Sequence, residues 1–236
     1  MSIDFKKNGN ITTMNNDTFV DVEASRDTVS VAFMKRTYQL LGLSMIAAAL
    51  GAFLTMPFAE TIQTFKLLIF GVELLILFVG FNMTRGKPAL NLGMLFLFTF
   101  MTGVSLVPLL NVFIGTGNGG IIGNAFLGTS VLFGALSMFA INSKEDFSNW
   151  GKPLFITLIV VIVLSLINMF ILQSPIMHVI ISAVVLLLFG LFTIYDTQNI
   201  ANGAYDSEVD AAVSLYLDFL NMFTAMLALL GLGSDD

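Results

Sequence analysis

Cysteine is absent from the 236-residue sequence, and histidine occurs once, as His178. The absence of cysteine excludes disulfide bonds, thiolate metal sites and a cysteine nucleophile. A single histidine excludes a metal site built from histidines. No resident cofactor is therefore expected.

Charged residues are also scarce. They make up 11% of the chain, whereas a soluble domain has about 25%. Hydrophobic residues make up 56%, including 23 Phe and 13 Met. A soluble domain cannot cover so many apolar side chains, but a bilayer accepts them directly. The composition predicts an all-α, polytopic membrane protein whose main partner is lipid.

The polar residues indicate how the chain is divided. No basic cluster interleaved with aromatics occurs and the net charge is −6, so nucleic-acid binding is not expected. The first thirty residues are polar and acidic, without apolar periodicity, which excludes a secretory signal at this position. We predict a disordered cytoplasmic leader over residues 1–30 and one seven-helix transmembrane domain over residues 31–236.

Seven apolar stretches have the length needed to span about 30 Å of hydrocarbon. Gly, Pro and polar residues separate them. The predicted spans are Tyr38–Pro57, Phe65–Met83, Ala89–Ile114, Ile121–Ile141, Pro153–Gln173, Met177–Tyr195 with a possible extension to Ala201, and Asp210–Leu230.

The basic residues predict the orientation, because positively charged loops remain cytoplasmic. With the amino terminus inside, nine Lys and Arg residues are cytoplasmic and only Lys66 is outside. Seven spans then place the carboxyl terminus on the opposite side. The cytoplasmic residues are Lys6, Lys7, Arg26, Lys35, Arg36, Arg85, Lys87, Lys144 and Lys152.

The loop between the last two spans differs from the other cytoplasmic loops, because it carries Asp206, Glu208 and Asp210 and no basic residue. These acids either solvate a short turn and cap the seventh span through Asp210, or form a vestibule that concentrates cations.

Three ionisable residues lie well inside predicted spans: Glu73, Asp196 and Asp218. An acid at the bilayer centre costs about 2.5 to 3.5 kcal/mol to insert, so such residues usually face a protein interior or a wet cavity. Because the last two spans form a hairpin, Asp196 and Asp218 lie at similar depths, roughly 8 and 12 Å from its loop at about 1.5 Å per residue. If their side chains converge, the two carboxyl groups share a proton and titrate as a unit.

Each of these residues also has a purely structural interpretation. Protonated acids can hydrogen-bond between helices and stabilise the bundle, and for Glu73 both interpretations have equal weight. Arg85 is most simply a positive-inside anchor, but it also lies where it can reach a carboxylate at the cytoplasmic mouth.

Two stretches carry a family resemblance. The segments FTIYDTQNI (residues 192–200) and SLYLDFLNMF (residues 214–223) resemble those of the Bax inhibitor, or transmembrane Bax inhibitor motif, family in a bacterial form. The resemblance covers nearly all of the membrane region, including Glu73 and the stretch from Thr102 to Pro108, and excludes the leader.

The resemblance implies a bundle in which six helices surround the seventh, with a pH-sensitive calcium leak controlled by a di-aspartyl pair. Asp196 and Asp218 match that pair. It also implies an arginine latch at the cytoplasmic end of the second span, but counting from Glu73 places Thr84 there, with Arg85 one residue later. One residue turns a side chain by about 100°, which argues against a latch by Arg85.

We therefore expect a leak pathway for calcium in which protons and basic side chains compete for Asp196 and Asp218. Calcium prefers six to eight oxygen ligands, so two carboxylates would bind it weakly and transiently, as a permeant ion. No enzymatic activity is expected. The resemblance and the short chain favour a bacterial inner membrane.

Two alternatives remain open. A proton-coupled cation exchanger would use Glu73 and the two aspartates as a relay. An intramembrane aspartyl protease would use Tyr195 and Asp196 with the segment GLGSD (residues 231–235). That segment carries an inserted serine and follows the last span, so Asp235 is displaced from the depth of Asp196.

Overall fold

The computed structural model describes the backbone of residues 16–231 and the side chains of residues 30–231. Every regular element in the described backbone is helical. Seven helical segments are long and apolar enough to cross a membrane. The predicted all-α fold with seven spans is confirmed.

The seven spans contain several interruptions of the α-helical pattern. The second and fifth spans each include one π-helical segment, and the first ends in a 3-10 turn at Pro57 followed by a short helix. The elements in chain order are α1 (Asn16–Thr55), η1 (Met56–Phe58) and α2 (Ala59–Thr64); α3 (Lys66–Leu75), η2 (Ile76–Gly80) and α4 (Phe81–Thr84); α5 (Pro88–Gly115); α6 (Gly120–Asn142); η3 (Ser148–Trp150), α7 (Gly151–Ile167) and η4 (Asn168–Leu172); α8 (Pro175–Ala201); and α9 (Glu208–Gly231).

The beginning of α1 differs from the prediction for the leader. The helix starts at Asn16, so residues 16–30, which were predicted to lack regular structure, are helical; residues 1–15 lie outside the described backbone. No Gly or Pro occurs between residues 16 and 30. Extending an existing helix costs much less than starting a new one, so the membrane span can continue into this polar segment.

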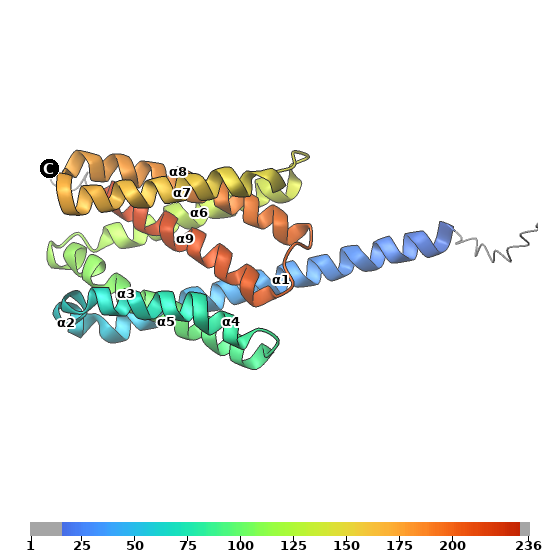
Figure 1. Ribbon diagram of the computed structural model, residues 1–236, viewed down its shortest axis with the longest axis horizontal. Coiled ribbons are helices and arrows are strands. Elements are labelled where there is room, and N and C mark those ends of the chain that lie inside the picture. The colour runs from blue at the N-terminus through green and yellow to red at the C-terminus, as the bar shows by residue number, and fades with distance from the viewer. Residues whose placement is uncertain (1–15, 232–236) are drawn as a thin grey trace, which may run out of the picture.

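The loops gather at two ends of the bundle. Figure 1 shows that α1 protrudes from one end, where the turn at residues 85–87, the loop at residues 143–147 and the loop at residues 202–207 also lie. We call this the basic end, because these segments and the adjoining helix starts contain Arg85, Lys87, Lys144 and Lys152. The connections between α1 and α2, α5 and α6, and α7 and α8 lie at the opposite end (Figure 1).

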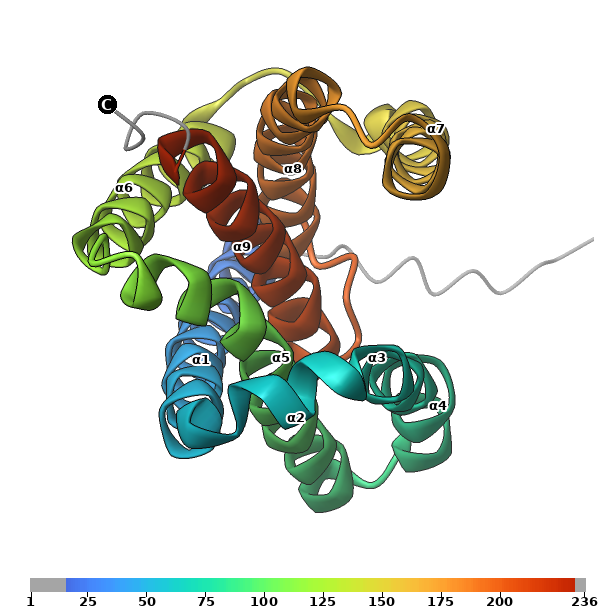
Figure 2. The ribbon, with the colours of Figure 1, turned by 90° about the vertical axis from the view of Figure 1, so that its left-hand side faces the viewer.

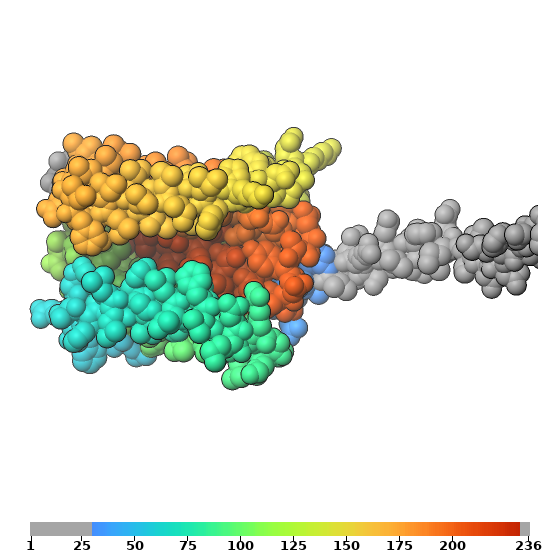
Figure 3. Space-filling view, in the orientation of Figure 1, coloured from blue at the N-terminus to red at the C-terminus, as the bar shows by residue number. Residues whose placement is uncertain are grey.

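The last span, α9, forms the centre of the bundle. Half of its most apolar stretch is buried, compared with 17 to 39% in the other spans. It packs directly against α1, α5, α6 and α8, while α7 packs on α8 and the α3–α4 span packs on α5. Figure 2 shows the other spans arranged around α9, and in Figure 3 α9 is visible only between the layers formed by α7–α8 and α3–α4.

The exterior of the bundle is apolar, as a lipid-facing surface requires. On α7 only Leu154 and Val161 are buried, and large aliphatic and aromatic side chains are exposed along the helix. Those exposed on α7 are Phe155, Ile156, Ile159, Val160, Ile162, Val163, Leu164 and Leu166. Because exposing so much apolar surface to water is unfavourable, the packing agrees with a bundle that lies in the hydrocarbon of a membrane.

Candidate functional site

Asp196 and Asp218 meet inside the bundle. Asp196 lies near the end of α8 and Asp218 lies on α9, and these two helices pack extensively along their hairpin. Their side chains are 7% and 3% exposed. The two carboxyl groups lie close enough to interact directly, and no hydroxyl or N–H donor among the described residues reaches Asp218 Oδ2. Two carboxyl oxygens in contact can share a hydrogen bond only when one of the groups carries a proton.

A tyrosine from the α8–α9 loop completes the aspartate pair. The Tyr205 phenol donates a hydrogen bond to Asp196 Oδ1 at 3.0 Å. The Tyr205 hydroxyl oxygen also lies 3.0 Å from Ser214 Oγ, and Ser214 is one helical turn before Asp218 on the same face of α9. Burial, followed by the negative charge of Asp196, raises the pKa of Tyr205 above its ordinary value, so the phenol remains a donor at neutral pH.

The residue after Asp196 connects three helices beside the pair. Thr197 Oγ1 donates to Ser137 Oγ on α6 at 3.3 Å. The Tyr38 hydroxyl on α1 lies 3.2 Å from the same Thr197 Oγ1. These neutral hydrogen bonds hold α1, α6 and α8 together at this depth. Thr197 therefore has a structural role that needs no contact with the carboxyl groups.

Gln198 fixes the loop between α6 and α7. Its Nε2 donates to the Glu145 carbonyl at 2.7 Å, and its Oε1 accepts from the Phe147 backbone N–H at 2.6 Å. Because the amide uses both its donor and its acceptor, the loop at residues 143–147 is held against α8. The segment FTIYDTQNI (residues 192–200) thus combines the Asp196 carboxyl group with two residues, Thr197 and Gln198, that hold the neighbouring helices and loop in place.

A cavity of about 670 Å³ opens at the basic end, next to the aspartate pair. One wall is the turn containing Arg85 and Lys87, and the other is the segment 204–210 with Ser214. The second wall carries Asp206, Glu208 and Asp210. Helix α9 begins at Glu208, and Ser207 Oγ accepts from the backbone N–H of Val209 and Asp210. Asp210 lies in the first turn of α9, as predicted for an acid near the helix N-terminus, but Ser207 rather than Asp210 supplies the capping oxygen.

Arg85 lies at this cavity but is not bonded to the aspartates. It is exposed and has left the helical conformation, with ψ at 133°. The one ion pair among the described side chains joins Arg36 and Glu208 at 3.6 Å. Thr84 occupies the buried position, where its hydroxyl lies 3.2 Å from Asn91 Oδ1 on α5. The π-helical segment η2 (Ile76–Gly80) lies between Glu73 and Arg85 and widens one turn of this helix.

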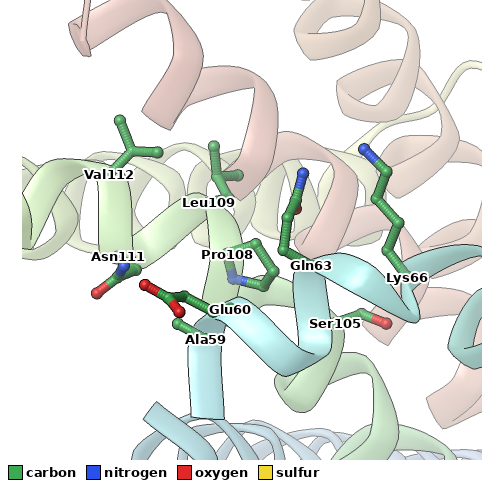
Figure 4. A pocket seen from close by; sticks show the side chains of 9 residues that line it. All are labelled: Ala59, Glu60, Gln63, Lys66, Ser105, Pro108, Leu109, Asn111 and Val112. Atoms are coloured by element: carbon green, nitrogen blue, oxygen red, sulfur yellow. The ribbon is translucent and has the colours of Figure 1, made fainter. Parts of the chain in front are cut away.

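Glu73 belongs to a separate site in the other half of the bundle. It is buried on α3 and accepts a hydrogen bond from Ser105 on α5. Ser105 also lines a second cavity of about 680 Å³, together with Glu60, Gln63 and Lys66 (Figure 4). This cavity lies beside α2 and opens at the end opposite the basic end. Glu73 is therefore close to one cavity, and the aspartate pair is close to the other.

Tyr216 of α9 is buried in the bundle interior, against α5. It is 2% exposed, and its hydroxyl shares a hydrogen bond with Thr102 on α5. Glu73 is near enough to Tyr216 to act on it electrostatically. The sequence analysis singles out neither Tyr205 nor Tyr216, although Tyr216 lies within SLYLDFLNMF, the second segment that carries the family resemblance.

The described side chains offer carboxyl pairing rather than a tight metal site. No group of three or more His, Asp or Glu residues within residues 30–231 is arranged to hold a metal ion. Asp196 and Asp218 together supply at most four oxygens. An ion of calcium's size would need water or backbone carbonyls for its remaining ligands.

The fold and these sites define an integral membrane protein of seven spans with a carboxyl pair in its protein-lined interior. The family model described as "Inhibitor of apoptosis-promoting Bax1" matches residues 30–235. The chain belongs to this Bax inhibitor family, as its two segments around Asp196 and Asp218 suggested.

Bacterial relatives match nearly the whole chain. A protein of Helicobacter pylori strain ATCC 700392 / 26695 is 45% identical, over 89% of this chain and 90% of its own length. An uncharacterized membrane protein of Vibrio cholerae is 35% identical, over 84% and 88%. The Escherichia coli K12 protein named Modulator of FtsH protease YccA is 31% identical, over 91% and 98%. A similar protein of Escherichia coli strain CFT073 is named Inner membrane protein YccA.

Proposed function

We propose that the protein is a pH-sensitive calcium leak channel in a bacterial inner membrane, with Asp196 and Asp218 as its proton-sensing gate. The observation that carries the proposal is the pairing of these two carboxyl groups in the bundle interior. Two facing carboxylates repel each other unless a proton or a cation lies between them. Protons and calcium therefore compete for the same oxygens.

The positions of the cavities support a pathway through this bundle. One cavity borders Tyr205 and Ser214 next to the aspartate pair, and the other borders Ser105 next to Glu73. Neither cavity is lined by residues of the other, and side chains such as Tyr216 are buried in the bundle interior. In this proposal the described state is the closed one, and conduction requires α9 or its neighbours to move. Weak ligation by two carboxylates allows an ion that enters to leave again.

We also propose an orientation of the bundle in the membrane. The basic end faces the cytoplasm, because the described bundle has Arg85, Lys87, Lys144 and Lys152 there and Lys66 at the other end. The chain has no cysteine, so single-cysteine variants can be labelled from either side without background. Asn202→Cys should react in inverted vesicles and Asn118→Cys in intact cells. The opposite pattern would contradict this orientation.

Calcium flux into liposomes tests the gate. Asp196→Asn and Asp218→Asn should each remove the pH dependence of flux, because an amide neither binds nor releases a proton in this range. Asp146→Asn makes the same change at an exposed loop residue and should behave as the wild type. If both interior variants retain the wild-type flux and pH profile, the proposed function is wrong.

The same assay distinguishes the alternatives. A proton-coupled exchanger would require a proton gradient for cation flux, whereas a leak responds to pH without one. For the proposed non-enzymatic function, no peptide substrate should be cleaved. Cleavage blocked by an aspartyl-protease transition-state mimic would support the protease alternative; its Asp235 lies outside the described residues.

A second candidate function is regulation of a membrane protease. The relative named Modulator of FtsH protease YccA aligns with 91% of this chain, and similarity of that extent covers the whole bundle. We infer that this chain can bind an FtsH-type protease within the membrane. Co-purification from cells that contain both proteins, and a changed degradation rate of a membrane substrate, would support this function. Unchanged degradation together with no co-purification would exclude it.

A further inference from the structure

Tyr205 lies between the cavity at the basic end and the aspartate pair. Its side chain is half-buried and lines the cavity. Asp196, to which the phenol donates, is 7% exposed and is not among the cavity-lining residues. The phenol is therefore the group in the α8–α9 loop that contacts both the cavity and the pair.

The loop that carries Tyr205 is short and held at both ends. At the α8 end, the backbone N–H groups of Asn202 and Ala204 donate to the carbonyls of Gln198 and Asn199. Gly203 has a φ of 73°, a left-handed conformation that glycine adopts without strain. At the α9 end, Ser207 caps the helix. These constraints leave Tyr205 in the middle of the loop with its ring directed back toward α8.

The basic side chains on the other wall of the cavity, Arg85 and Lys87, do not take the position of Tyr205 beside Asp196. Arg85 and Lys87 are exposed, and neither forms an ion pair within the described part of the chain. Thr84, the buried residue of that helix end, is hydrogen-bonded to Asn91 instead. The hydroxyl that does reach Asp196 from this side of the pair is that of Tyr205.

We propose that Tyr205 is the positioning residue that closes the cytoplasmic side of the aspartate pair, in place of a basic latch. Its phenol fixes Asp196 by a hydrogen bond, and its ring covers the pair from the cavity. Opening requires the α8–α9 loop to move away and break the contacts with Asp196 and Ser214. The proposal rests on the proposed gate and identifies the residue that controls access to it.

The charges around Tyr205 determine how its loss should be detected. Asp196 and Asp218 face it from α8 and α9. The cavity beside it is lined by Arg85 and Lys87 and by Asp206, Glu208 and Asp210. A hydrogen bond donated to a carboxylate favours the ionised form. Removing only the hydroxyl changes that balance and leaves these neighbouring charges in place.

The first test compares the pH profile of calcium flux for Tyr205→Phe with that of the wild type. The midpoint should move upward by about one pH unit, the size expected for the loss of one hydrogen bond to a charged group. Tyr195→Phe is the matched control, because Tyr195 is equally half-buried and adjoins Asp196 in sequence, and its profile should not move. A Tyr205→Phe profile that superimposes on the wild type would overturn the proposal, even if Asp196→Asn confirms the gate.

The second test does not depend on calcium flux. Asp218→Cys introduces the only thiol of the chain and leaves Asp196 and its bond to Tyr205 in place; its reaction with a membrane-impermeant maleimide from the basic end measures access to the pair. Adding Tyr205→Ala should accelerate labelling at least tenfold, whereas adding Tyr195→Ala should not. Equal labelling rates with and without the Tyr205 ring would show that the ring does not cover the pair, whatever ion the protein conducts.

Discussion

Gly103 of α5 lies against the carbonyl oxygen of Ala48 in α1. A Cβ atom at Gly103 would be 2.0 Å from that oxygen, and one at Gly51 would be 2.2 Å from the Phe100 carbonyl oxygen. Small residues let transmembrane helices approach this closely. The α1–α5 pair is one of the two most extensive helix contacts of the bundle, so it depends on the absence of these side-chain atoms.

We expect Gly103→Ala to destabilise the protein by about 1–3 kcal/mol, the usual cost of overpacking. The new methyl group meets backbone, which cannot rotate away. Thermal unfolding of the purified protein in detergent measures the change. Gly93→Ala on the same helix is the control, because nothing lies within 4 Å of its added Cβ; an equal loss of stability in both variants would contradict this explanation.

Ser105→Ala should destabilise the bundle by about 1–3 kcal/mol, because it leaves the buried Glu73 carboxyl without its hydroxyl donor. The unfolding midpoint in detergent should fall by several degrees. Ser130→Ala removes a hydroxyl that bonds only to its own helix at Phe126 and should have little effect. If the two variants unfold at the same temperature, the bond from Ser105 does not contribute measurably.

Glu208→Gln should change stability by less than about 1 kcal/mol, as is usual for an exposed ion pair. The Arg36 partner is 75% exposed, and the two charged groups are 3.6 Å apart. Raising the salt concentration should reduce even this small difference. A large, salt-independent loss of stability would mean that the pair holds α1 to the start of α9 more strongly than its exposure indicates.

Asp146 should titrate below its ordinary pKa. The backbone N–H of Ser148 donates to its carboxylate at 2.9 Å, and this bond, followed by the Ser148 side chain, lowers the pKa. Because the folded value is lower than the unfolded one, the ionised group stabilises the turn at neutral pH and loses that effect as pH falls through the folded value. Carbon NMR titration of Ser148→Ala should still show a lowered pKa, since the backbone bond remains; a return to the ordinary value would contradict this assignment.

The span count could be predicted from the sequence because length and apolarity are properties of continuous segments. The predicted ends of the third, fourth and seventh spans agree within a few residues with those of α5, α6 and α9, which start at or next to Pro88, Gly120 and Ser207. The π-helical segments could not be predicted. Their residues, such as those of η2, are ordinary aliphatic and aromatic side chains whose local pattern does not reveal the wider turn.

The proximity of Asp196 and Asp218 followed from the hairpin, since two antiparallel helices bring residues at equal distances from the loop to one depth. The helix count from Glu73 also placed Thr84, and not Arg85, at the inward position, and in the described structure Thr84 is buried while Arg85 is exposed. Tyr205 was missed. A loop residue that reaches back to the preceding helix produces no periodic signal, and only a tyrosine within a short glycine-containing loop marks the position.

The central location of α9 has a consequence for how the molecule is made. The ribosome synthesises α9 after the six other spans, so the surrounding helices exist before the helix at the centre of the bundle. Until α9 arrives, α8 lacks its most extensive packing partner, and the faces of α1 and α6 that pack on α9 are uncovered. Assembly must therefore finish late, and damage to the α8–α9 hairpin should trap a loosely associated intermediate rather than a smaller native protein.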